Sequence, residues 1–313
     1  MNVHSYKVLE FNKLREELSQ YMTIEENQEK ILELEPFKDI NSLRKELEII
    51  KDFMDFLKYD GGFEPAGMRD IAGITRKAQL VGMYLEPEDL WSININLRIF
   101  RIFKGRLEGL EKYRDLRGKF INVPTLKNFE DLINKAIDPD KNIKDDASID
   151  LRELRFQKKN MVANIKRKFE EMFANPTYTK AIQEKIITTR DGRSVIPVKT
   201  DFKGLIKGIE HDRSSSGSTV FIEPISIVSL NNKMRELEVR EREEIRKILL
   251  RLTDQVRLNT EVINEIGASI MYLDILNGKS QFGIEKKCTI PEINNKEMLS
   301  LVKARHPFID ENM

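Results

Sequence analysis

Basic residues gather in two neighbouring stretches of this chain, and their chemistry suits a phosphate backbone. In residues 152–168, lysines and arginines stand against a single acid, Glu153. In residues 182–224, more of them are spread over short β-branched runs. Each phosphate that a cation neutralises releases condensed counterions, so this distribution favours nucleic-acid binding. The candidate contacts are Lys158, Lys159, Arg190, Arg193, Lys199, Lys203, Lys207 and Arg213.

The same cations also fit an ordinary solvated surface. Lysine and arginine are common on exposed helix faces. The acids that dilute the positive charge of the second stretch are Glu184, Asp191, Asp201, Glu210, Asp212 and Glu223. Both interpretations stay open from the residues alone.

A hydroxyl-rich turn follows Arg213. Ser214, Ser215 and Ser216 precede Gly217, which permits a positive φ, so successive N–H groups and hydroxyls can surround an oxyanion. Serine-rich turns are also common for local reasons, because the hydroxyls satisfy their own backbone. The turn is therefore either a phosphate contact or a plain loop.

Neither catalysis nor metal binding is expected from the remaining polar residues. His211 and Asp212 are adjacent, and adjacent residues on a strand point to opposite faces, which disfavours a catalytic arrangement with a serine. The acids between residues 138 and 150 do not have the spacing of a calcium loop. We expect them to favour the start of the following helix, with Ser148 near its cap. We predict no catalytic and no metal-binding residue.

The elements that position the cations are a small sheet and two long helices. Ile186–Thr189 and Ser194–Lys199 are β-branched runs joined through Asp191-Gly192, a strong hairpin signal. Further strands are predicted around Leu205–Glu210 and Thr219–Ile222, which gives a compact antiparallel sheet of about four strands.

Apolar residues at three- and four-residue steps predict one helix from Ala147 to about Asn175 and another from about Ser226 to Leu276. These two helices form antiparallel arms with the sheet at their tip. Lys158 interrupts the apolar stripe of the first arm and Glu241 that of the second, so the seam is not a perfect heptad zipper.

The rest of the chain predicts a helical domain and a short tail. Helices are expected at residues 9–22, 25–34, 41–57 and 68–78, and from Pro87 to about Arg117. Loops are expected at Pro124 and at residues 138–140. Short β-like stretches are expected at residues 288–290 and 296–303, and the chain stops soon afterwards, which predicts a truncated sequence. The fold class is thus mainly α with a small antiparallel β insertion.

Composition and motifs argue against binding of a polyanion by overall charge, against a membrane span and against a nucleotide site in this chain. The net charge is +1, so attraction to a polyanion must be local. A single cysteine, Cys288, fits a reducing cytoplasm, and no apolar run reaches the roughly 20 residues that span a bilayer. The chain has no G-x-x-x-x-G-K-[ST] phosphate loop, so no nucleotide cofactor is expected within it.

Six stretches together resemble the second bacterial MutS family, whose members lack the mismatch-reading domain. They are MRDIAGITRKAQLVGMYLEPEDL, AIDPDKNIKDDASIDLRELR, RDGRSVIPVKTDFKG, KGIEHDRSSSGSTVFIEP, LNNKMRELEVREREEIRKILLRLT and ARHPFI. The resemblance covers nearly the whole chain. It implies a helical core domain (1–146), an outgoing lever helix (147–181), a β-rich clamp (182–224), a returning lever helix (225–277) and the start of a segment that leads to an ATPase (278–313).

The resemblance also implies a function. The complete protein would be a homodimeric, cytoplasmic ATPase and endonuclease that uses ATP and Mg²⁺, and this chain would be its clamp and lever part, without enzymatic activity of its own. Three partners stay open. The clamp binds branched or duplex DNA to suppress homologous recombination, or it grips ribosomal RNA or protein on stalled or collided ribosomes, or the arm makes only protein–protein contacts.

Overall fold

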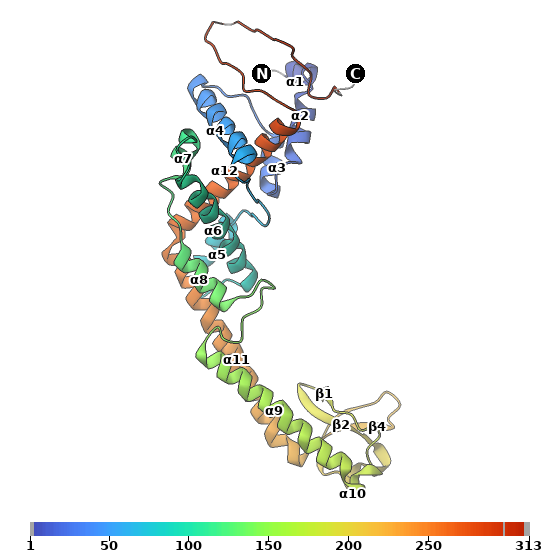
Figure 1. Ribbon diagram of the computed structural model, residues 1–313. Helices are drawn as coiled ribbons and strands as arrows, with labels where there is room; N and C mark the ends of the chain where they lie inside the picture. The colour runs from blue at the N-terminus through green and yellow to red at the C-terminus, as the bar shows by residue number, and fades with distance from the viewer. Residues whose placement is uncertain (1–2, 297, 310–313) are drawn as a thin grey trace. The chain divides into compact units, whose positions relative to one another are not determined.

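The computed structural model describes residues 3–296 and 298–309 (Figure 1). The chain forms two compact units. One, the helical unit, contains the residues up to Asn134 and from Leu252 onward. The other, the sheet-bearing unit, contains Lys135–Arg251.

The helical unit is organised around α12 (Thr260–Glu285), which packs against helices from several parts of the chain (Figure 1). The buried carboxylate of Asp274 on α12 holds the N-terminal end of α3 (Glu25–Leu32). It accepts hydrogen bonds from the backbone N–H groups of Thr23 (2.8 Å) and Ile24 (3.1 Å) and from Asn27 Nδ2 (2.9 Å). The other helices are α1 (Val3–Val8), α2 (Phe11–Ser19), α3 (Glu25–Leu32), α4 (Ile40–Tyr59), α5 (Ala72–Ala78), α6 (Pro87–Glu108), α7 (Arg114–Phe120) and most of α8 (Lys127–Ala136).

Two features of this unit differ from the sequence prediction. The helix that begins at Pro87 ends at Glu108 and not near Arg117, because Gly109 follows and a second helix, α7, starts at Arg114. The sequence prediction also names no element between the loops at Pro124 and residue 138, where the structure has α8.

The prediction of a single returning helix is also wrong, because the structure has two helices in this part of the chain. Here α11 (Ile225–Leu258) ends before Asn259, and α12 follows. Asn259 Nδ2 and Thr260 Oγ1 donate to the carbonyls of Gln255 (2.8 Å) and Val256 (2.9 Å). Such local side-chain bonds compete with the helical ladder and explain the break.

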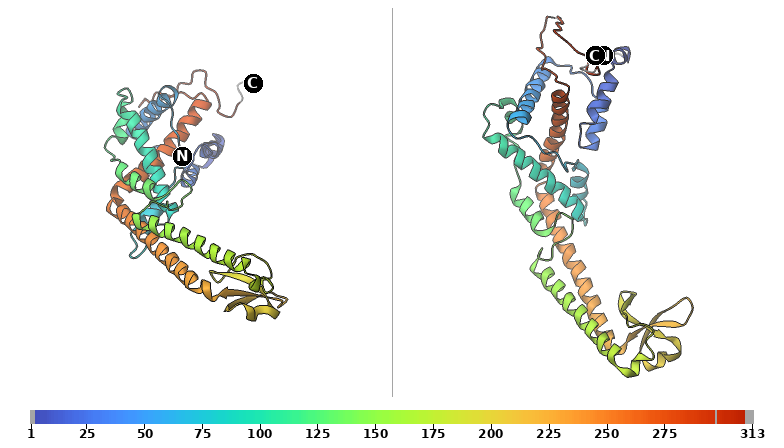
Figure 2. Two further views of the ribbon diagram at one scale, coloured as in Figure 1. Left: turned by 60° about the horizontal axis from the view of Figure 1, so that its bottom comes forward. Right: turned by 45° about the vertical axis from the view of Figure 1, so that its right-hand side comes forward.

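In the sheet-bearing unit, α9 (Ile149–Ala174) and α11 lie side by side and antiparallel (Figure 2). Ser148 caps α9, as predicted, by accepting a hydrogen bond from Leu151 N at 3.0 Å. The helix ends before Pro176, which cannot continue it and which opens the short helix α10 (Pro176–Thr179).

The sheet has four strands in the order β1-β2-β4-β3, and each strand is antiparallel to its neighbours. Their bounds are β1 (Thr188–Arg190), β2 (Arg193–Lys199), β3 (Gly208–Arg213) and β4 (Thr219–Pro224). The hairpin at Asp191-Gly192 is confirmed, and both residues have positive φ (48° and 73°), as its tight turn requires. β2 and β3 both flank β4, so the chain between them crosses β4 through the 3₁₀ helix η1 (Thr200–Leu205).

The predicted strand at Leu205–Glu210 is displaced, since β3 runs from Gly208 to Arg213. A bulge at His211 interrupts its register with β4. The β-like stretches expected in the tail are wrong for the described residues, which form no strand between Cys288 and Lys303; residue 297 lies outside the description.

Candidate nucleic-acid interface

An apolar core fixes the sheet to the ends of α9 and α11 that are nearest to it. Val198, Val220 and Ile222 from the strands pack with Phe169 of α9 and Ile227 of α11. Side chains alternate along a strand, so the residues between these core positions point to the other face. Lys199 and Thr219, which are register partners, belong to that outer set.

Arg193 is held inside the unit by a buried carboxylate. Its Nη1 lies 2.8 Å from Glu223 Oε1, and Glu223 has no exposed surface. Asn231 Nδ2 donates to the same oxygen at 2.8 Å, and His211 Nε2 lies 2.6 Å from Glu223 Oε2. This network joins three strands to α11, so Arg193 stabilises the fold and is poorly available to a ligand.

The charge state of Glu223 follows from its surroundings. Burial alone would raise the pKa of this carboxyl, but the hydrogen bonds from Asn231, His211 and Arg193 outweigh it and hold the pKa below its ordinary value. The sequence did not single out Glu223 as a buried group. The sequence offers one signal for a buried polar site here. The polar pair Asn231-Asn232 stands near the start of a predicted helix, among the residues of its apolar stripe.

Arg190 lies across the outer face of the sheet. Its guanidinium is 3.9 Å from the centre of the Phe221 ring, and its Nε donates to Asp212 Oδ2 at 2.8 Å. The predicted separation of His211 and Asp212 is found, because His211 bonds Glu223 and Asp212 bonds Arg190.

Arg213 and Lys203 share one acid. Both pair with Glu210, with Lys203 Nζ at 3.4 Å from Oε2 and Arg213 Nε bonded to Oε1. The Arg213 hydrogen bond lowers the pKa of Glu210, and the same bond raises the pKa of Arg213. These two cations are close together but partly neutralised.

Lys199 and Lys207 are different. Among the described residues, neither forms an ion pair. Lys207 is exposed next to the end of β4, where its carbonyl accepts a hydrogen bond from Ile225 N at 3.0 Å. Lys199 lies at the opposite end of β4, beside the serine turn.

The serine turn connects β3 to β4 and is partly satisfied by its own groups. Ser214 Oγ accepts from Thr219 N (3.1 Å), and Ser216 Oγ lies 2.8 Å from Ser218 Oγ. Within the described residues, the N–H groups of Ser215, Ser216 and Ser218 have no backbone acceptor. Thr200 Oγ1 donates to Gly217 O at 2.6 Å, which holds the turn against the end of β2 and next to Lys199.

Lys158 and Lys159 lie on α9, away from the turn, and their surroundings differ from each other. Lys158 faces α11 and pairs with Glu241, which also accepts from Arg155 Nε at 2.9 Å. Lys159 is exposed and forms no ion pair among the described residues. The structure therefore brings together Lys199, Lys203, Arg213 and Ser214–Ser216, and it leaves the α9 lysines and Arg193 outside that group.

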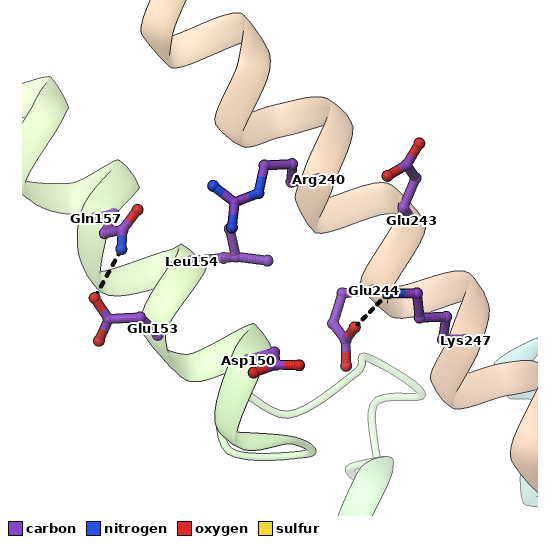
Figure 3. A pocket seen from close by; sticks show the side chains of 8 residues that line it. All are labelled: Asp150, Glu153, Leu154, Gln157, Arg240, Glu243, Glu244 and Lys247. Atoms are coloured by element: carbon purple, nitrogen blue, oxygen red, sulfur yellow. Dashed lines mark hydrogen bonds and ion pairs between the residues drawn. The ribbon is translucent and has the colours of Figure 1, made fainter.

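A groove of about 240 Å³ between α9 and α11 is acidic (Figure 3). Asp150 and Glu153 line it from α9, and Glu243 and Glu244 line it from α11, together with Arg240 and Lys247. Four carboxylates repel phosphate, so we expect no phosphate contact on this side of α9. No group of three His, Cys, Asp or Glu side chains among the described residues suits a metal ion.

The comparisons with known proteins address the whole chain. No family model matches it. It is 60% identical over 312 residues to a protein named Endonuclease MutS2 from Fusobacterium nucleatum, 34% identical over 313 residues to the Caldanaerobacter subterraneus protein of that name, and 33% identical over 315 residues to one from Clostridium perfringens.

These matches cover 99–100% of this chain and 39–40% of each relative. The chain thus spans about 40% of the length of the curated relatives it matches. Where the structure is described, no helix has the length and apolar character needed to cross a bilayer. The resemblance predicted from the sequence motifs is confirmed, and the chain belongs to the MutS2 family of MutS-like proteins.

Proposed function

We propose that the sheet-bearing unit is a nucleic-acid-binding module of a MutS2-type protein and that its contact is centred on the serine turn. The observation that carries this proposal is the position of Lys199. It has no acid partner among the described residues, and it stands beside a turn with unbonded N–H groups at Ser215, Ser216 and Ser218. A cation next to free backbone donors suits a phosphate oxygen.

The remaining cations would take secondary parts in this contact. Lys207 has no acid partner among the described residues at the other end of β4, while Lys203 and Arg213 would exchange their shared acid, Glu210, for phosphate. Exposed ion pairs of this kind are screened by water and contribute little to stability, so exchanging them costs little. Arg190 and Arg193 serve mainly to hold the sheet.

For the complete protein, we propose the activities of the family. The relatives are named as endonucleases, and their length leaves room for further domains beyond this chain. The complete protein would be a cytoplasmic homodimer that uses ATP and Mg²⁺ and that suppresses recombination by binding branched or duplex DNA through this module.

A ribosomal partner is the second candidate, and one observation favours it. Phe202, Leu205 and Ile209 on the crossover and on β3 are 43%, 45% and 45% exposed. Exposed apolar side chains on such a small unit suit a partner with protein as well as RNA at its surface. Stalled or collided ribosomes present both.

Binding across a salt series tests the proposal. The chain is titrated with a four-way DNA junction, a linear duplex and purified ribosomes from 50 to 300 mM salt (roughly the range in which phosphate contacts lose most affinity). A variant with Lys199→Gln and Lys207→Gln is compared with a control, Lys233→Gln and Arg242→Gln, on exposed positions of α11. We expect the first variant to lose about tenfold in DNA affinity and two units of salt slope, and the control to lose neither.

Tight ribosome binding with weak DNA binding would replace the first candidate by the second. Equal affinity of both variants and the unchanged chain for DNA would remove the serine turn from the contact. Failure of the unchanged chain to bind DNA or ribosomes would contradict the proposed function itself.

A further inference from the structure

The outward face of α9 carries a regular line of cations. Arg152, Lys159 and Lys166 recur every seven residues, and all three are exposed. Seven residues make nearly two helical turns, so the three side chains lie on one face, about 10.5 Å apart along the axis and about 21 Å from first to last. Phe156 lies between the first two on the same face and is 58% exposed.

These cations are almost free of intramolecular acids. Within the described residues, Arg152 and Lys159 form no ion pair, and the Lys166 Nζ lies 3.9 Å from Glu170 Oε1. The side chains of that last pair are 69% and 61% exposed, so water screens it and its worth is close to zero.

The residues of the same helix that face α11 or the groove have a different character. Arg155 and Lys158 turn toward α11 and are occupied by Glu241, and Asp150 and Glu153 line the acidic groove (Figure 3). Between residues 150 and 166, the side of α9 that borders the groove is therefore acidic, and the outward face is cationic. The sequence shows the seven-residue spacing of these cations, but it does not show which of the seven basic residues of the stretch have an acid partner.

We propose that the outward face of α9, formed by Arg152, Lys159 and Lys166, is a second contact for the phosphate backbone of duplex nucleic acid, distinct from the serine turn. A straight row of cations about 21 Å long matches an extended polyanion and is too long for a single phosphate or a small anion. Arg167 is a further exposed cation beside the end of the row, about 100° around the helix from Lys166, and its guanidinium lies 3.4 Å from Asn164 Oδ1. The proposal rests on the nucleic-acid role proposed above.

The test compares two triple variants with the same loss of charge. Arg152→Gln, Lys159→Gln and Lys166→Gln remove the row, and Lys233→Gln, Arg242→Gln and Arg246→Gln remove three exposed cations from α11. Glutamine is a good helix former, so both should keep the helical circular dichroism and thermal midpoint of the unchanged chain. A third variant, Arg152→Lys, Lys159→Arg and Lys166→Arg, keeps the charges and guards against a folding defect.

Affinity for a linear duplex is measured from 50 to 300 mM salt, as for the serine-turn variants. Each lost phosphate contact lowers the salt slope by about one, so the row variant is expected to lose nearly three units and at least about tenfold in affinity near 0.1 M salt. The α11 control and the charge-keeping variant are expected to bind like the unchanged chain.

The possible failures are distinguishable. If the row variant binds duplex like the α11 control while the serine-turn variant is weakened, the second contact is overturned and the proposed function stands. If poly-glutamate, but not duplex, binds the unchanged chain and the row variant loses it, the face recognises an acidic protein and the inference is overturned. If the unchanged chain binds no nucleic acid, both proposals fall together.

Discussion

Lys158 and Glu241 pair with each other across the seam between α9 and α11. They are the two residues that interrupt the apolar stripes of these helices, one on each. Arg155 joins them through a 2.9 Å bond from its Nε to Glu241 Oε1, so each interruption satisfies the other. A polar pair at this level favours one axial register of the two helices, since any slip would leave a carboxylate half-buried without a partner.

Removing Glu241 should therefore destabilise the sheet-bearing unit. We expect Glu241→Ala to lower the free energy of unfolding by about 1–3 kcal/mol, because Lys158 would lose its acid while it stays beside Arg155, which also pairs with Asp145. Urea denaturation monitored by circular dichroism measures the change. Glu238→Ala on the same helix is the comparison, and an equal loss there would show that the pair has no special part.

The pH dependence of stability should follow from the same seam. Burial raises the pKa of Glu241, but the bonds from Lys158 and Arg155 outweigh it, and the net pKa lies below the ordinary value of 4.5. A lowered folded-state pKa means that the stabilisation is complete above the unfolded-state pKa and is lost as the pH falls through the folded-state value. We expect stability to drop below about pH 4.5, less steeply in Glu241→Gln. Parallel pH profiles for the two proteins would contradict this assignment.

Breaking the Glu223 network should loosen the sheet more than the rest of the chain. Glu223→Gln leaves the partly buried Arg193 without its carboxylate, and removing one partner of a buried pair typically costs about 3–5 kcal/mol. Hydrogen exchange followed by mass spectrometry should show faster exchange in β2 and β4. Unchanged protection in those strands, with faster exchange only in the helical unit, would show that the network does not hold the sheet.

Gly208 should tolerate no side chain. A Cβ at this position would lie 2.3 Å from Glu223 O and 2.5 Å from Ile222 Cγ2, so the β3–β4 pairing would have to shift. We expect Gly208→Ala to cost at least about 2 kcal/mol, as overpacking does in tight sites. Gly204→Ala is the matched control, since a Cβ there has no atom within 4 Å, and its stability should hardly change. Equal unfolding midpoints for the two would refute the close approach.

Gly208 also marks a feature of the fold that the local sequence does not predict, which is the start of β3. The Asp191-Gly192 turn is encoded locally and was predicted correctly, because a two-residue turn with positive φ demands these residue types. The start of β3 depends on how closely Gly208 approaches β4, a contact with residues 222 and 223 that no local pattern contains. The local pattern therefore predicts a start for β3 that is too early, at Leu205 instead of Gly208.

The candidate contacts divide for the same reason. The sequence identifies the basic residues by their type, but whether each one is free to contact phosphate depends on acids that lie far from it along the chain. Arg193 meets Glu223 only because β2 and β4 pair, and Lys158 meets Glu241 only because α9 and α11 pack. Lys199 and Lys159 have the same local appearance and stay unpaired among the described residues.

Site-specific photocrosslinking tests the central claim most directly. A photoreactive phenylalanine analogue replaces Ser216 at the serine turn, or Tyr59, which is exposed on the helical unit, and each protein is irradiated with labelled duplex DNA near 0.1 M salt. The proposed contact predicts a covalent adduct from position 216 that excess unlabelled duplex suppresses, and little or none from position 59. An adduct from position 59 with none from position 216 would place the nucleic acid on the wrong unit and contradict it.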